Sequence, residues 1–228
     1  MRSKQSGFTL IEIAIVLVII GLLLGGVLKG QELINSAKIK NVANDLNGIS
    51  AAVYSYQDRY KTYPGDDNGA LARWGVGVPD GDKNGVVGGV GGAAAAGSFN
   101  EATAALSETI YFWRHLRLAG FVGGDTANGE QPQNALGGIV GVQTGTGNPA
   151  PLAPDISSLV VCTSNLNGKI AEAIDRQFDD GLIATGTLRG YVQAGAIARG
   201  GANPTRVAAV GAYNAADDTV LYTICKSL

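Results

Sequence analysis

The sequence predicts an α+β protein in which the C-terminal half of a long N-terminal helix packs on an antiparallel sheet, with extra short helices and loops. Two observations predict this fold class. Apolar residues recur at helical spacing over roughly the first quarter of the 228-residue chain. In the second half, β-branched runs are bounded by turn residues, which is typical of strands.

The first element is an apolar run over residues 8–28, in which Glu12 is the single charged residue. A helix of about 20 residues at ~1.5 Å each matches a hydrocarbon core of ~30 Å, so this run is long enough to cross a bilayer. A carboxylate in such a segment is costly, and a cation from another copy of the segment would offset that cost. The plainer alternative is an N-terminal membrane anchor, which has no use for Glu12.

The string Gly-Phe-Thr-Leu-Ile-Glu at residues 7–12, after a short basic leader, resembles the type IV prepilin signature. Pilins share this signature with the pseudopilins of type II secretion. The resemblance implies that a prepilin peptidase cuts between Gly7 and Phe8 and that the new amino group of Phe8 is methylated. It also implies that Glu12 pairs with the α-amino group of a neighbouring subunit.

The helical pattern does not stop at the membrane length. Apolar residues continue at helical spacing to Tyr56, so one helix is expected from Phe8 to Tyr60. The chain is therefore expected to have four parts. They are a leader peptide (1–7), a transmembrane or filament-core half of the helix (8–28), an amphipathic half (29–60) and a globular periplasmic or surface head (61–228).

The head is expected to contain two further helices. One covers residues 100–119 with Asn100 as its cap, and the other covers residues 167–178. The only histidine, His115, is expected to be a packing or hydrogen-bonded residue. Strands are expected at residues 139–142, 158–162, 188–194 and 219–225.

The chain has two cysteines, Cys162 and Cys225. An even pair in an exported chain predicts one disulfide. Closing a loop of this length stabilises a protein by roughly 4 kcal/mol in the chain-entropy model. A closed zinc site is a weak alternative, because two cysteines and one histidine do not complete it.

A second candidate site is the loop that carries Asp80, Asp82 and Asn84 at alternate positions before a glycine. Such a loop begins like an EF-hand, and the carbonyl of Val86 adds a fourth oxygen. No glutamate stands at the twelfth position, so a remote carboxylate has to complete a calcium shell, and Glu108 is the first choice. The other candidates for this ligand are Asp66, Asp67 and Glu101. The alternative is a solvated Asp/Gly turn.

The expected function is that of a structural subunit, a pilin, that self-associates into a type IV pilus-like helical filament. The alternatives are a pseudopilin of a type II secretion system and a membrane-anchored adhesion module that never polymerises. A net charge of −2 without a basic patch gives no support to nucleic-acid binding. No nucleophile motif, metal triad or phosphate loop supports an enzyme.

The resemblance also implies partners and a location. The partners are the prepilin peptidase, the inner membrane and other pilins or pseudopilins. The precursor is expected in the inner membrane of a bacterium, and the mature chain in a periplasmic or cell-surface filament.

Overall fold

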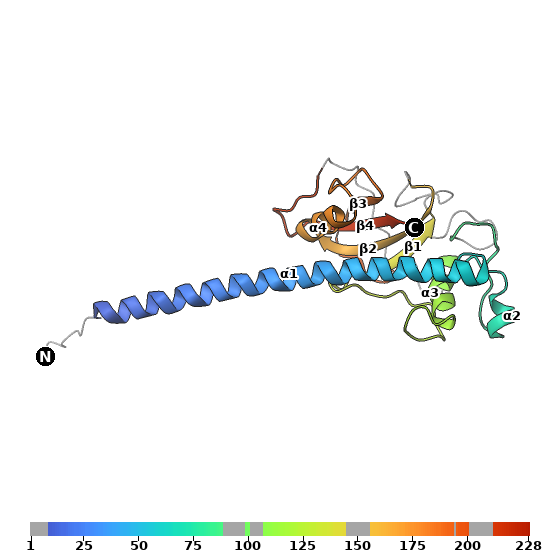
Figure 1. Ribbon diagram of the computed structural model, residues 1–228, viewed down its shortest axis with the longest axis horizontal. Helices are drawn as coiled ribbons and strands as arrows, with labels where there is room; N and C mark the ends of the chain where they lie inside the picture. Colours follow the sequence, from blue (N-terminus) through green and yellow to red (C-terminus); the bar gives the residue numbers. More distant parts are fainter. Residues whose placement is uncertain (1–8, 89–98, 101–106, 145–155, 194, 201–211) are drawn as a thin grey trace. The chain divides into compact units, whose positions relative to one another are not determined.

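The computed structural model describes residues 9–88, 99–100, 107–144, 156–193, 195–200 and 212–228. The chain divides into two compact units, Met1–Lys38 and Ile39–Leu228, and the helix α1 (Leu10–Tyr60) contributes to both. The order of the elements along the chain can be followed in Figure 1.

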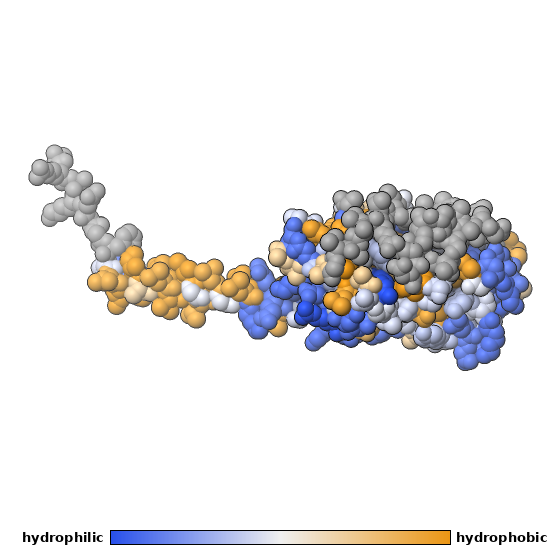
Figure 2. All heavy atoms as spheres, turned by 90° about the horizontal axis from the view of Figure 1, so that it is seen from above, coloured by the Kyte–Doolittle hydropathy of each residue, from blue (hydrophilic) through white to orange (hydrophobic). Residues whose placement is uncertain are grey.

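The described part of the first unit is the N-terminal half of α1. Its apolar side chains face outward, and Leu10 and Leu22 are 91% and 73% exposed. Figure 2 shows the apolar surface of this half as one continuous area. By length and composition, α1 is able to cross a membrane. A helix that is apolar on all sides is stable in lipid or among other helices, so this half needs such surroundings.

In the second unit, one face of α1 is buried. Along this face, residues that expose at most 7% of their surface recur every three or four positions, as an amphipathic helix requires. They share a core with inward-facing residues of the sheet, and Figure 1 shows this half of α1 lying along the sheet. The predicted packing of the helix on the sheet is confirmed. The buried residues are Val42, Leu46, Ile49, Val53 and Tyr56.

Four strands form one antiparallel sheet in the order β1-β2-β4-β3, so β4, the last strand in the sequence, is internal. Each predicted strand is present. β2 continues beyond its predicted end because its polar residues still pair with β4 after a register shift. The strands are β1 (Val140–Thr144), β2 (Leu159–Asn167), β3 (Leu188–Val192) and β4 (Leu221–Ser227).

The sheet is covered on both faces, because successive side chains of a strand point to opposite sides. Val161 and Ile224 belong to the core cluster that contains the buried face of α1. Cys162 and Cys225 belong to a second cluster with Phe99. The second cluster therefore fills the face of the sheet that is turned away from α1.

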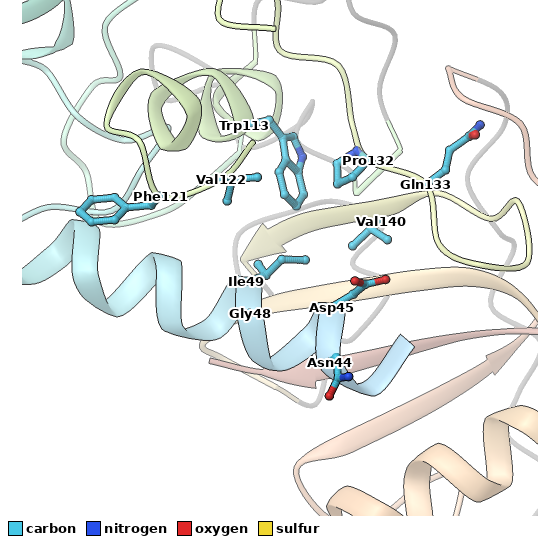
Figure 3. Close-up of a pocket in the computed structure, with 10 residues that line it drawn as sticks. All are labelled: Asn44, Asp45, Gly48, Ile49, Trp113, Phe121, Val122, Pro132, Gln133 and Val140. Atoms are coloured by element: carbon cyan, nitrogen blue, oxygen red, sulfur yellow. The ribbon is translucent and has the colours of Figure 1, made fainter. Parts of the chain in front are cut away.

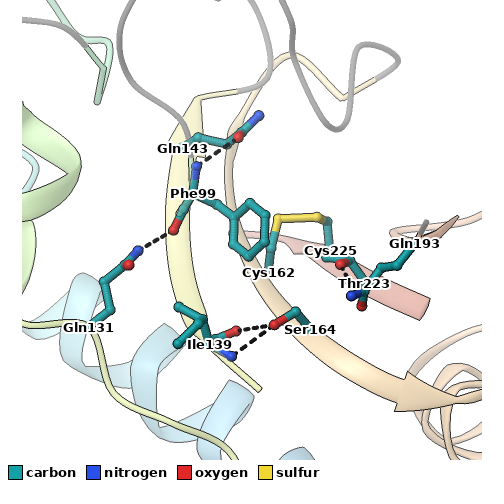
Figure 4. Close-up of a disulfide and its surroundings, with 9 residues drawn as sticks. All are labelled: Phe99, Gln131, Ile139, Gln143, Cys162, Ser164, Gln193, Thr223 and Cys225. Carbon is teal, nitrogen blue, oxygen red and sulfur yellow. Dashed lines mark hydrogen bonds between the residues drawn. A yellow bond between two sulfur atoms is a disulfide. The ribbon is translucent and has the colours of Figure 1, made fainter. Parts of the chain in front are cut away.

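The predicted disulfide is confirmed: Cys162 and Cys225 are bonded at 2.03 Å and both are fully buried. They stand directly opposite each other on β2 and β4. Figure 4 shows Phe99 lying beside the bridge. Gln143 accepts a hydrogen bond from the Phe99 backbone N–H at 3.1 Å, and Gln131 donates to its carbonyl, so the backbone of this residue is fixed on both sides.

The helix α3 (Glu108–Leu118) begins later than predicted, and the prediction that Asn100 caps it is wrong. The side chain of Asn100 bonds a distant segment instead, through the Ala198 carbonyl and the Gly200 N–H, both at 3.1 Å. Ser107 caps α3, because its hydroxyl accepts from the Thr109 N–H at 3.3 Å. Residues 101–106, with the candidate ligand Glu101, lie outside the described residues.

The described residues of the head contain two other helices. The five-residue helix α2 (Ala70–Trp74) was not predicted, because it is too short to show a period. The helix α4 (Gly168–Phe178) agrees with the prediction, and Asn167 caps it by accepting from the Ile170 N–H at 3.0 Å.

Candidate functional site

Glu12 lies in the first turn of α1, where it forms a capping box with Thr9. Its Oε2 atom accepts from both the N–H and the hydroxyl of Thr9 at 2.8 Å, and the Glu12 N–H donates to the Thr9 hydroxyl at 3.4 Å. The sequence contained the signal for this cap, a Thr followed three residues later by a Glu. Within one chain, Glu12 therefore starts the long helix. Gly7 and Phe8 lie outside the described residues.

A second candidate site is in the head, where three carboxylates from separate segments converge. One oxygen atom each of Asp66, Asp82 and Glu108 lies within 4.8 Å of the other two. Asp66 follows the end of α1, Asp82 lies in the predicted cation loop, and Glu108 is the first residue of α3. Asp66 is 2% exposed and Glu108 is fully buried. Buried like charges at this separation repel one another unless a cation or protons neutralise them.

Backbone N–H groups hold these carboxylates in place. The two oxygens of Glu108 accept from the Asp82 N–H at 2.9 Å and the Gly88 N–H at 3.1 Å. The two oxygens of Asp66 accept from the Asn84 N–H at 2.8 Å and the Gly85 N–H at 3.0 Å. Hydrogen bonds of this kind fix the ligand atoms before an ion arrives, and this lowers the entropic cost of binding.

The electrostatics of the cluster favour an added positive charge. Burial raises the pKa of Glu108 to about 7, and the neighbouring charges of Asp82 and Asp66 also raise it. Burial is likewise the largest cause that raises the pKa of Asp66. The backbone hydrogen bonds lower both pKa values, and burial outweighs them, so the two carboxylates are compensated only in part. A divalent cation would complete the compensation, and carboxylate oxygens are the ligands that Ca²⁺ prefers.

The backbone of the loop approaches the end of α1 closely, which requires glycine at one position. A Cβ on Gly81 would lie 2.2 Å from the Gly65 carbonyl oxygen. The Gly81 N–H donates to the Asp67 carbonyl at 2.9 Å, and the Lys83 N–H donates to the Asp66 carbonyl at 3.1 Å. Any larger residue at position 81 would push Asp82 away from Asp66.

The structure thus brings only some of the predicted calcium ligands together. Asp82 and Glu108 come together as predicted, and Asp66, one of the alternative candidates, joins them. Asp80 accepts from the Leu71 N–H at 2.7 Å in α2 and is not part of the cluster. The side-chain oxygen of Asn84 accepts from the Val86 N–H at 2.7 Å. The remaining candidate, Asp67, accepts from the Tyr56 hydroxyl at 2.6 Å and is paired with Arg73.

His115 fixes the two segments that carry Asp66 and Asp82. It is fully buried. Its Nδ1 atom accepts from the Gly65 N–H at 3.0 Å, so the proton of the neutral ring is on Nε2, which donates to the Pro79 carbonyl at 2.9 Å. The expectation that His115 is a hydrogen-bonded packing residue is confirmed.

The stability of the head is expected to fall at acid pH because of His115. Burial lowers its pKa to about 4, and the positive charges of Arg73 and Arg114 act in the same direction. The neutral ring therefore contributes its full stability above about pH 6.5 and loses it as the pH falls through about 4, with a total of roughly 3 kcal/mol. Urea unfolding from pH 4 to 7 measures this contribution.

His115→Gln is the matched variant for this titration, because glutamine keeps a donor and an acceptor but does not titrate in this range. The difference in unfolding free energy between the two chains should shrink as the pH falls from 7 to 4. A difference that does not depend on pH would contradict the assignment. Other groups that titrate contribute equally to both chains and cancel.

The comparisons with known proteins concern the start of the chain. Residues 2–28 match the family model described as the prokaryotic N-terminal methylation motif. The chain carries the type IV pilin and pseudopilin signature. The methylation motif includes Gly7, Phe8 and Glu12, and it ends within α1. Neither the curated proteins nor the solved structures gave a match.

The methylation motif implies processing by a prepilin peptidase and assembly of the mature chain into filaments. Together with the apolar N-terminal half of α1, it fits a precursor that is anchored in a membrane. The motif marks pilin-like structural subunits, which are generally not enzymes. The motif at residues 2–28 therefore supports a type IV pilin-like or pseudopilin-like protein.

Proposed function

We propose that the chain is a pilin, the structural subunit of a type IV pilus-like filament. The observation that carries this proposal is the methylation motif at the start of one helix that runs from Leu10 to Tyr60. The same helix supplies an all-round apolar half and an amphipathic half. The first half suits the interior of a bundle of helices, and the second suits attachment of a head.

Burial of the apolar half would drive assembly. Its leucine, isoleucine and valine side chains are about half to nine-tenths exposed in the single chain. In a filament outside the membrane, shielding one such side chain from water contributes about 1.5–3 kcal/mol. Packing against neighbouring helices replaces lipid contacts by tighter contacts between side chains. Each subunit therefore gains a large interface from this segment alone.

Glu12 would set the register of this interface. A carboxylate among apolar helices is stable when it is paired, and the α-amino group of a neighbouring chain is the cation that leader cleavage creates. Docking out of register would leave both charges buried and unpaired. The capping box with Thr9 leaves the second carboxylate oxygen of Glu12 without a hydrogen bond among the described residues. This oxygen is available to an incoming cation.

The nearest alternative is a pseudopilin of a type II secretion system. The carboxylate cluster fits a pseudopilin-like head in which a cation orders a loop. The disulfide that closes the last strand fits a pilin-like head, and we give it more weight because Cys162 and Cys225 are bonded to each other, whereas the cation is itself a proposal. A membrane-anchored adhesion module would need Glu12 only for the capping box with Thr9, and the second carboxylate oxygen of Glu12 would have no partner chain to bind.

Imaging with an antibody against the head tests this proposal. Labelling along the sides of surface filaments is expected for a major pilin, and labelling at the tips would indicate a minor one. Surface filaments that carry no label, together with retention of the chain in the membrane fraction, would contradict the proposal. Filaments that appear only when the chain is overproduced would favour the pseudopilin.

We also infer that Asp66, Asp82 and Glu108 bind calcium. This set replaces part of the ligand set that the sequence suggested, because Asp80 and Asn84 use their side-chain oxygens elsewhere. Three carboxylates supply up to six oxygens, which is within the number that Ca²⁺ takes. The ion would tie the end of α1, the loop and the start of α3 together.

Calcium is expected to raise the melting temperature of the head. At a concentration about 100-fold above the dissociation constant, the gain is about 2.7 kcal/mol, or roughly 5–10 °C for a domain of this size. Differential scanning fluorimetry with calcium, with magnesium and with a chelator measures the gain. An unchanged melting temperature in all three conditions would argue against the site.

Two matched variants distinguish the ligand sets. Asp82→Asn should abolish the response to calcium, because it removes one of the three clustered charges. Asp80→Asn should keep the response, because an amide oxygen at this position still accepts from the Leu71 N–H. Loss of the response in Asp80→Asn alone would instead support the ligand set expected from the sequence.

A further inference from the structure

A pocket of about 290 Å³ opens beside the second half of α1, away from the carboxylate cluster. Its walls are apolar: Trp113 is fully buried, Val140 is 2% exposed and Ile49 is 7% exposed. Figure 3 shows these three side chains facing one another across the pocket, with Asp45 at the edge formed by α1. The pocket is therefore a mostly apolar hollow, in which Asp45 is the one acidic residue of the described lining, beside the amides of Asn44 and Gln133.

Gly48 lies in the wall that α1 contributes. A Cβ placed on Gly48 would meet nothing within 4 Å, so no contact within this chain requires glycine there. A glycine inside a helix costs about 1 kcal/mol relative to alanine. Close approach by another molecule would explain why this position has no side chain.

Asp45 has no cation beside it within the described part of the chain. Although it is exposed on one side, burial of the other side raises the pKa of its carboxyl above the ordinary value. A group that fits this place has a positive charge for Asp45 and an aliphatic stem for the apolar walls. A lysine side chain has both.

The proposed function indicates which lysine can reach this pocket. If the α-amino group of Phe8 in one copy pairs with Glu12 of the next, the two parallel helices are offset by four residues, or about 6 Å. Counted along the continuous helix α1 (Leu10–Tyr60), the same offset of four residues makes residue 41 of the first copy correspond to Asp45 of the second. Lys40, which is exposed on α1, is one residue from that position, or about 1.5 Å.

The geometry points to a docking site for a second copy of this chain, in which Lys40 of one copy enters the pocket of the next. This inference rests on the proposed function. The ammonium group of Lys40 pairs with Asp45, and its stem packs against Trp113 and Val140. Gly48 lets the neighbouring chain come close to α1. The repeated contact would join the heads of successive subunits, in addition to the contact that Glu12 makes at the other end of the helix.

A charge exchange in the full chain tests the pairing, with filament yield as the measurement. Asp45→Lys and Lys40→Asp should each lower the yield by at least about tenfold, because each leaves like charges facing one another. The combined Lys40→Asp and Asp45→Lys chain should recover most of the yield. Gly48→Leu should also lower the yield, because its side chain fills the pocket.

Asp58→Lys is the matched control, since Asp58 lies on the same helix and outside the pocket. It should assemble normally. A melting curve confirms that each variant has a folded head. Normal assembly of folded Asp45→Lys and Gly48→Leu chains would overturn the inference and leave the proposed function intact. No recovery in the combined chain would overturn the pairing. A wild-type chain that never forms filaments would overturn both.

Discussion

Glu12→Val is expected to abolish filament formation and to leave the head folded. Valine is compatible with an apolar segment, so insertion into the membrane should persist. The α-amino group of the neighbouring subunit, however, would be buried without a partner. Removing one member of a buried ion pair costs about 3–5 kcal/mol, which is a factor of roughly one hundred to several thousand at each contact between subunits.

Two control variants separate the possible causes of this loss. Glu32→Val removes another glutamate from the same helix, where it pairs with Lys29 on an exposed surface, and it should assemble normally. Thr9→Val removes the capping box but keeps Glu12, and it should cost only about 1 kcal/mol of helix stability. Sheared filaments, quantified by immunoblot and by electron microscopy, give the yields. A normal yield from Glu12→Val would refute the role of Glu12 in assembly.

Replacing Cys162 and Cys225 together with alanine is expected to lower the free energy of unfolding by about 4 kcal/mol. The bridge closes 63 residues of chain, and its loss restores that freedom to the unfolded state. Both sulfur atoms also lie in the buried cluster around Phe99, so the smaller alanine side chains leave space there. Urea unfolding of both chains in detergent measures the loss.

Thr223→Ala is the control for this pair. Thr223 is the buried neighbour of the bridge on β4, and its hydroxyl donates to Gln193 at 3.1 Å. Loss of one such hydrogen bond costs about 1 kcal/mol. If the double cysteine variant lost no more than this control, the bridge would not be a main source of stability.

Patterns that are local in the sequence predicted most of the fold. The sustained helical spacing of apolar residues predicted α1 as far as Tyr60. This spacing is present whatever surrounds the helix. β-Branched runs located the four strands. The pairing of Cys162 with Cys225 followed because an exported chain with two cysteines has one way to close a bridge. The helical spacing of apolar residues over 167–178 located α4 in the same way as α1.

The predictions from the sequence were wrong where segments that are distant in the sequence come into contact. Asn100 has the chemistry of a helix cap, but its side chain bonds residues about a hundred positions further along the chain. The spacing of Asp80, Asp82 and Asn84 suggested one contiguous ligand loop. Asp66 enters the cluster instead, because Gly81 lets two backbones come close together. No pattern within a short stretch of the sequence predicts that these two backbone segments come close together.

The internal position of β4 has a consequence for the timing of folding. Residues 221–227 fill the space between β2 and β3, so neither neighbouring strand has its full set of partners until this last segment is in place. Until β4 pairs, the earlier part of the head would have exposed strand edges that are prone to aggregation. A chain that stops shortly before β4 would therefore lose the partner of β3 and the second partner of β2, and not one strand alone.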